Sequence, residues 1–279
     1  MIYLLACVIS ALGWTVSYRI SLRKGCNPTG TLAGIGCTSV IFSYTIFFSQ
    51  SRTPFNSDAV LIGVSGGICM YFAVFSYFHL LKGGARLGIS WTIVTLSMTI
   101  PTAGSILLWH ELPGFLQWLS LLLTVTSITL LGRVQEKGVQ FTKRDIFFLS
   151  TAFLLSGIGA LLIKTLVSLG LEKYRNIYFV SLHTTVLLIA IIVNLLGRHL
   201  PSGRELLFGS AMGLAGFGNY WFILLALREL PGIVAFPLRT CGSIVLTLFV
   251  SRIAWQERLA PGEVIGVVLA MAAIILMNL

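Results

Sequence analysis

Apolar stretches of about twenty residues recur along almost the whole chain and leave only short polar connections between them. An α-helix needs about 20 such residues to cross a hydrocarbon core about 30 Å thick. Charged residues make up 10% of the 279 residues, whereas a soluble domain carries about 25% to coat its surface. Lipid must therefore cover most of the exterior, and we predict an all-α polytopic membrane protein.

Charges and clusters of proline and glycine mark the ends of ten predicted transmembrane helices. The first five are 2–22, 29–49, 58–81, 86–109 and 114–132, and the second five are 146–169, 175–197, 204–228, 231–253 and 260–278. The connections are too short to hold a domain outside the membrane. Because no basic segment precedes the first apolar run, we expect that run to be a helix and not a cleaved signal peptide.

An internal repeat appears when the chain is aligned with itself at an offset of 146 residues. Two motifs recur at this offset: Gly63-x-x-x-Gly67 as Gly209-x-x-x-Gly213, and Trp109-x-Glu111 as Trp255-x-Glu257. We interpret the glycines as packing positions and the two glutamates as anchors at helix ends. The pattern predicts two five-helix repeats, 1–135 and 144–279. Because five is odd, the repeats are inverted, as in transporters whose binding site lies between two halves.

The net charge of +10 is explained better by membrane topology than by nucleic-acid binding, because the basic residues are spread over several loops. Thirteen lysines and arginines lie in or beside the odd-numbered loops, and four lie in the even-numbered loops. The positive-inside rule then places the odd loops in the cytoplasm and both termini outside.

The chain resembles the ten-helix, EamA-type members of the drug/metabolite transporter superfamily, and the number and length of its predicted helices extend this resemblance over its whole length. The resemblance is carried by the Trp-x-Glu motifs that close the fourth and ninth helices and by the segment Trp255-Gln-Glu-Arg-Leu-Ala-Pro-Gly-Glu-Val-Ile-Gly266. It implies a cavity lined by helices one, three, four, six, eight and nine. It implies substrates such as amino acids, amphiphilic metabolites, nucleotide sugars or lipid-linked sugars. It also implies cytoplasmic termini, opposite to the charge distribution. Small multidrug members carry a glutamate in the first helix, whereas this first helix has Trp14 and no acid, which argues against proton-coupled export of cationic drugs.

Arg239 is predicted about 4–5 Å from the centre of the ninth helix. An arginine at that depth costs about 2.5–3.5 kcal/mol on insertion scales, and no acidic residue is predicted at a similar depth. We interpret Arg239 as a ligand-binding cavity residue; an arginine bonded to backbone carbonyls is the alternative. Pro237 in the same helix and Pro101 in the fourth helix predict interruptions, which either mark the binding site or serve as packing kinks.

Further side chains are candidates for the cavity wall. Lys164 and Arg19 are predicted about 10 Å from the midplane, where a long side chain either faces the cavity or reaches the interface. Asn219 is predicted mid-helix, as a ligand contact or an interhelical hydrogen bond. We expect His183 to be neutral and bonded across helices. The remaining candidates are His79, Trp14, Tyr18, Tyr71, Trp91 and Tyr220.

These residues favour a secondary transporter that moves a small anionic or zwitterionic metabolite by alternating access. A flippase, or flippase subunit, for a lipid-linked phosphate or sugar carrier would use the same basic cavity, opened toward lipid. An enzyme acting on polyprenyl phosphate is disfavoured, because the chain lacks clustered carboxylates or metal-ligand spacing of its cysteines, and no cofactor is expected. The expected location is a bacterial inner (plasma) membrane, without nucleic acid; a homodimer is left open.

Overall fold

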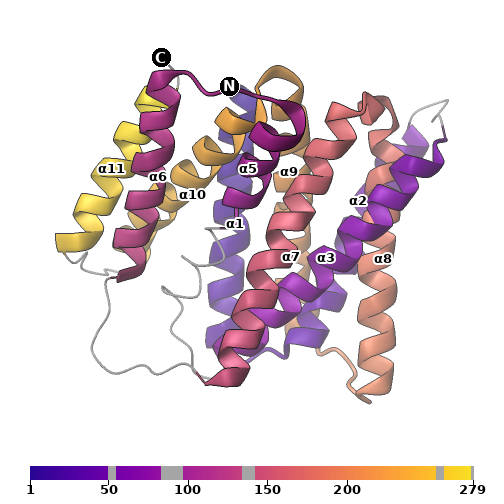
Figure 1. Cartoon of the computed structure of the whole chain (residues 1–279). Helices are drawn as coiled ribbons and strands as arrows, with labels where there is room; N and C mark the ends of the chain where they lie inside the picture. The colour runs from indigo at the N-terminus through magenta and orange to yellow at the C-terminus, as the bar shows by residue number, and fades with distance from the viewer. Residues whose placement is uncertain (50–54, 83–96, 134–141, 256–260, 278–279) are drawn as a thin grey trace.

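A computed structural model describes residues 1–49, 55–82, 97–133, 142–255 and 261–277. Within these ranges the chain forms ten α-helices and one short 3-10 helix, η1 (Figure 1). They are α1 (Ile2–Arg23), α2 (Pro28–Ser49), α3 (Ser57–Lys82), α5 (Thr99–Trp109), α6 (Phe115–Arg133), α7 (Lys143–Ser168), η1 (Leu171–Tyr174), α8 (Arg175–Leu196), α9 (Gly203–Glu229), α10 (Gly232–Trp255) and α11 (Pro261–Met277). The fourth predicted helix, 86–109, overlaps α5, and its first part lies outside the described residues.

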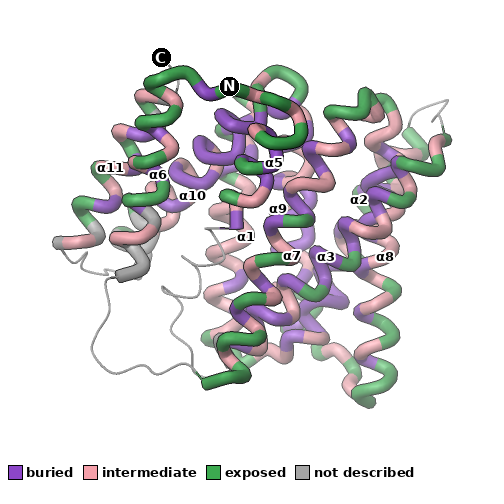
Figure 2. Tube along the Cα trace, in the orientation of Figure 1, coloured by how far each residue is buried: buried purple, intermediate pink, exposed green. Residues whose placement is uncertain are grey.

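Within the described residues, six helical segments are long and apolar enough to cross a membrane: Ile2–Arg23, Pro28–Ser49, Ser57–Leu80, Lys143–Ser168, Leu171–Leu196 and Gly203–Glu229. Four further apolar helices have shorter described stretches, in α5, α6, α10 and α11. Large apolar side chains cover the outside of the bundle, such as Phe48 at 73% and Leu107 at 72% exposure. Buried residues gather in the middle of the bundle (Figure 2). The all-helical membrane fold is confirmed.

Side-chain caps decide where two of these helices begin. The Thr142 hydroxyl accepts a hydrogen bond from the Asp145 backbone N–H, and the Asp145 carboxylate accepts one from the Thr142 N–H. Ser202 and Glu205 form the same reciprocal pair at the start of α9. Each box satisfies N–H groups that have no partner within the helix. The cap explains why α7 begins at Lys143 and not at residue 146, where we predicted its start.

Each main contact between two helices recurs between their counterparts in the other half of the chain. Adding 146 to the bounds of α3 gives 203–228, within one residue of α9. By the same offset α1, α2, α5 and α6 correspond to α7, α8, α10 and α11. Accordingly α1 packs along α9 and α7 along α3, while α2 packs on α9 and α8 packs on α3. The pairs α2–α8, α5–α10 and α6–α11 join each helix to its own counterpart, with α6 and α11 at one edge of the bundle (Figure 1).

The two Gly-x-x-x-Gly motifs lie at corresponding helix crossings. On α3, a Cβ added at Gly67 would lie 2.5 Å from the Leu182 carbonyl oxygen of α8. On α9, a Cβ added at Gly209 would lie 2.3 Å from the Thr31 carbonyl oxygen of α2. Both distances are shorter than any real contact of a Cβ atom. The backbones of these helices therefore approach at a distance that only glycine permits.

Candidate functional site

A cavity of about 190 Å³ lies among α1, α3, α7, α9, α10 and the residues that lead into α5. These segments correspond to the six helices that the family resemblance implies as the wall. Trp14, Met70 and Met98 are among its apolar lining residues. Its polar lining residues are Ser97, Ser156, Asn219, Tyr220, Arg239, Thr240 and Ser243. The cavity is therefore large enough for a small molecule and has one cationic side chain among the described residues of its wall.

Arg239 projects from α10, two residues after Pro237, which lies inside the helix. Its Nη2 atom donates a hydrogen bond of 2.6 Å to the Asn219 Oδ1 atom. Its Nη1 atom lies 3.5 Å from the Met98 sulfur. Both partners are neutral, and the described part of the chain places no carboxylate in an ion pair with this guanidinium. The positive charge therefore stays available to an anion in the cavity, to which the planar guanidinium can donate further hydrogen bonds.

Asn219 is fixed by contacts on the side away from Arg239. Its Nδ2 atom donates to the Cys7 carbonyl oxygen at 3.0 Å, and the Cys7 thiol donates to the Asn219 carbonyl oxygen at 3.3 Å. The amide nitrogen therefore faces α1, and the amide oxygen is left to face Arg239. This buried link orients the guanidinium from α9 while holding α1 and α9 together.

The predicted aromatic wall is divided between the cavity and the core behind it. Trp14 lines the cavity and stacks on Tyr18, with ring centroids 5.1 Å apart. Tyr18 is buried behind it, against Tyr77 and Phe78. Tyr220 also lines the cavity, whereas Tyr71 is fully buried beside aromatic neighbours on α3 and is not among the lining residues. Among the described aromatic candidates, Trp14 and Tyr220 are thus the two that can meet a ligand directly.

Lys164 does not line the cavity, because it forms a buried ion pair with Glu111. Its ammonium also lies 5.7 Å from the centre of the Trp109 ring. The other carboxylate oxygen of Glu111 accepts a hydrogen bond of 3.1 Å from the backbone N–H of Ile233, in the first turn of α10. A carboxylate at this position is favoured by the helix dipole. The sequence identified both charges but not their pairing, which joins α5, α7 and α10.

The other candidates lie away from the cavity or outside the described residues. The His79 ring contacts the Phe75 carbonyl oxygen at 3.0 Å and does not line the cavity, nor does Arg19. His183 is buried and bonds the Ser43 hydroxyl of α2 at 2.7 Å. Pro101 is buried inside α5, while Pro237 lines a second cavity beside the first. Trp91 and Glu257 lie outside the described residues, and Trp255 is placed only as the last residue of α10.

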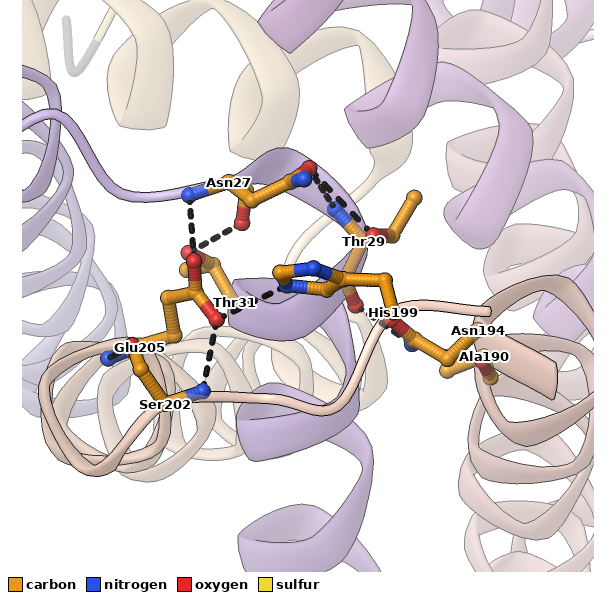
Figure 3. A network of polar contacts seen from close by, with 8 residues as sticks. All are labelled: Asn27, Thr29, Thr31, Ala190, Asn194, His199, Ser202 and Glu205. Atoms are coloured by element: carbon orange, nitrogen blue, oxygen red, sulfur yellow. Dashed lines mark hydrogen bonds and ion pairs between the residues drawn. The ribbon is translucent and has the colours of Figure 1, made fainter. Parts of the chain in front are cut away.

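A polar network at the start of α9 was missed at the level of sequence (Figure 3). The Glu205 carboxylate is buried and accepts hydrogen bonds from the backbone N–H groups of Asn27, at 2.8 Å, and Ser202, at 2.8 Å. It also accepts one from His199 at 3.0 Å. The Ser-x-x-Glu cap is readable from the sequence, but the partners from the α1–α2 and α8–α9 connections are not. The network joins these two connections by hydrogen bonds.

Replacing Glu205 with alanine is expected to lower the free energy of unfolding by about 3 kcal/mol. The substitution leaves two backbone N–H groups and an imidazole without their acceptor, and each buried donor left unpaired costs about 1–3 kcal/mol. Chemical unfolding of the purified protein in mild detergent measures the change. Asp145→Ala is the matched control, because it removes the same kind of cap at an exposed position and should cost about 1 kcal/mol. Equal losses for the two variants would contradict a role of the network beyond capping.

A helical bundle that presents apolar residues outward and encloses a cavity with one arginine among its described lining residues fits the class of multi-pass membrane transport proteins. Residues 143–279 match the EamA-like transporter family, and this match supports the resemblance to the EamA-type members of the drug/metabolite transporter superfamily. No curated protein matches the chain. Among solved structures 28 chains match. One crystal structure of a protein, 14% identical in sequence, covers 99% of this chain and 94% of its own with a TM-score of 0.78, which supports the fold.

Proposed function

We propose that this protein is a secondary transporter for a small anionic or zwitterionic metabolite, which binds in the central cavity at Arg239. The observation that carries the proposal is the surroundings of Arg239, whose described partners are an amide oxygen and a thioether. A phosphate or carboxylate would supply the negative charge that the described residues of the cavity wall lack. Such charge-assisted hydrogen bonds are about twice as strong as neutral ones.

On this proposal, the two repeats of the chain provide the mechanism of alternating access. Residues 1–135 and 144–279 act as two inverted halves, and the cavity takes residues from both. Trp14 and Met70 come from the first half, and Asn219 and Arg239 come from the second. The exchange of helix contacts between the halves supports this assignment. Rocking of one half against the other would open the cavity first to one side of the membrane and then to the other.

Replacing Arg239 with glutamine is expected to reduce uptake of the transported anion by tenfold or more. A hydrogen bond to a charged group contributes about 1.5–3 kcal/mol, which corresponds to about a 10- to 150-fold change in affinity. The measurement is uptake of a panel of radiolabelled organic phosphates and carboxylates into proteoliposomes, with protein-free liposomes as the blank.

Arg228→Gln is the matched control for this substitution. Arg228 lies near the end of α9, is 44% exposed and pairs with Glu172 at 3.5 Å, so that its loss removes a positive charge from the surface and not from the cavity. Uptake by this variant should remain close to that of the unaltered protein. If Arg239→Gln and the control transport equally well, the proposed anion site is wrong.

A further inference from the structure

A second cavity, of about 200 Å³, lies between α5, α6 and α10, and we refer to it as the side cavity. Met98 and Thr240 belong to its wall and also to the wall of the central cavity. Met98 therefore lies between the side cavity and Arg239, and its sulfur is 3.5 Å from the Arg239 Nη1 atom. Its other wall residues include Ala103, Ile106, Leu121, Val125 and Pro237.

The wall of the side cavity is mostly apolar, and two of its threonines, Thr102 and Thr124, use their hydroxyls within their own segments. The Thr102 hydroxyl donates to the Met98 carbonyl oxygen at 2.8 Å. The Thr124 hydroxyl donates to the Ser120 carbonyl oxygen at 2.9 Å. Both hydroxyls are thus satisfied within their own segments and demand no polar partner in the cavity. Hydrocarbon suits this surface, whereas a polar group would lose its hydration there without compensation.

The outer end of the side cavity reaches the lipid-facing surface. Ala103 on α5 is exposed, and so is Val125 on α6, at 44%. Leu107 and Leu122, one turn from them along α5 and α6, are 72% and 64% exposed, as expected of residues that face acyl chains. The side cavity therefore extends from the lipid-facing surface between α5 and α6 to the wall of the anion site.

We propose that the side cavity binds the apolar chain of the transported anion, so that the substrate is an amphiphile with its phosphate or carboxylate at Arg239 and Asn219. This inference rests on the proposed function, because it requires the anion site. A rigid polar metabolite would fill the central cavity alone and would leave the side cavity without a role. A chain that follows the headgroup past Met98 and Thr240 would occupy both.

The affinity of simple alkyl phosphates tests the inference. Each methylene that enters an apolar site should tighten binding about fourfold, equivalent to about 0.8 kcal/mol, until the side cavity is full. Methyl, butyl and hexyl phosphate are titrated by calorimetry into the full-length protein in lipid nanodiscs, and empty nanodiscs are titrated to subtract partition into lipid. We expect hexyl phosphate to bind at least tenfold more tightly than methyl phosphate.

Two substitutions that fill the side cavity test whether the effect of chain length on affinity arises there. Ala103→Phe from α5 and Val125→Trp from α6 should each bring the affinity ratio of hexyl to methyl phosphate down to about one. Leu107→Phe is the matched control, because it adds the same ring one turn further along α5, on the exposed face outside the cavity. This variant should keep the full ratio. A separate series with hexanoate and acetate distinguishes a carboxylate headgroup from a phosphate.

The outcomes separate this inference from the proposed function. If methyl phosphate and acetate both fail to bind, or bind equally well to Arg239→Gln, the anion site itself is wrong and the amphiphile proposal falls with it. If they bind through Arg239 but chain length has no effect, only the role of the side cavity is overturned. Retention of the full ratio by both Ala103→Phe and Val125→Trp overturns it as well.

Discussion

Replacing Glu111 with alanine is expected to lower the free energy of unfolding by about 3–5 kcal/mol. The Lys164 side chain is 7% exposed and Glu111 is 16% exposed, so that the substitution leaves a buried ammonium without the carboxylate that now neutralises it. The Ile233 backbone N–H, in the first turn of α10, also loses its acceptor. Chemical unfolding of the purified protein in mild detergent measures the effect.

Two variants show whether the loss comes from an unpaired buried charge. The double substitution Glu111→Leu with Lys164→Met removes both charges and should recover most of the stability, since apolar residues of similar volume often replace a buried ion pair at little cost. Glu172→Ala breaks the exposed pair with Arg228 and should cost about 1 kcal/mol or less. If the double variant is as unstable as Glu111→Ala, packing and not charge explains the loss.

Replacing Gly209 with leucine is expected to destabilise the protein by about 3 kcal/mol or more and to separate α9 from α2. A Cβ at this position would lie 2.3 Å from the Thr31 carbonyl oxygen and 2.8 Å from the Gly34 Cα atom. Both obstacles are backbone atoms, which cannot turn aside as a flexible side chain would. Inserting bulk into a packed core costs about 1–3 kcal/mol where side chains can adjust, and this crossing leaves less room for adjustment.

Gly203→Leu is the control for this substitution. Gly203 is at the start of the same helix, and no atom lies within 4 Å of a Cβ added there. This variant should unfold at nearly the same denaturant concentration as the unaltered protein. If Gly209→Leu also unfolds there, the close approach of α9 and α2 is not important for stability.

The sequence was sufficient to predict the helices because the bilayer sets their length. The first helix was predicted at 2–22 and observed at Ile2–Arg23; the seventh was predicted at 175–197 and observed at Arg175–Leu196. Each segment must contain enough apolar residues to cross the hydrocarbon, and this requirement can be read without knowledge of its neighbours. Arg239 was found in the same way, because a charge within an apolar run is costly wherever the helix packs.

Contacts between distant residues were decided by the tertiary structure alone. Glu111 was predicted as a helix-end anchor and Lys164, 53 positions away, as a cavity or interface residue, yet the fold joins them into one buried pair. Glu205 and Asn27 are 178 positions apart. Hydropathy records how deep a residue lies in the membrane but not which neighbour it faces, because the rotation and crossing of each helix depend on the whole packing.

By itself, the sequence determined the membrane fold, the ends of most helices, the pairs of glycine motifs and the one arginine near the middle of a helix. These are properties of local composition and depth. The tertiary structure decided that Lys164 pairs with Glu111 while Arg239 faces the cavity with neutral partners. It also decided that an apolar side cavity adjoins the central cavity at Met98. The physical reason is that charge pairing and cavity shape depend on how side chains from several helices pack against one another.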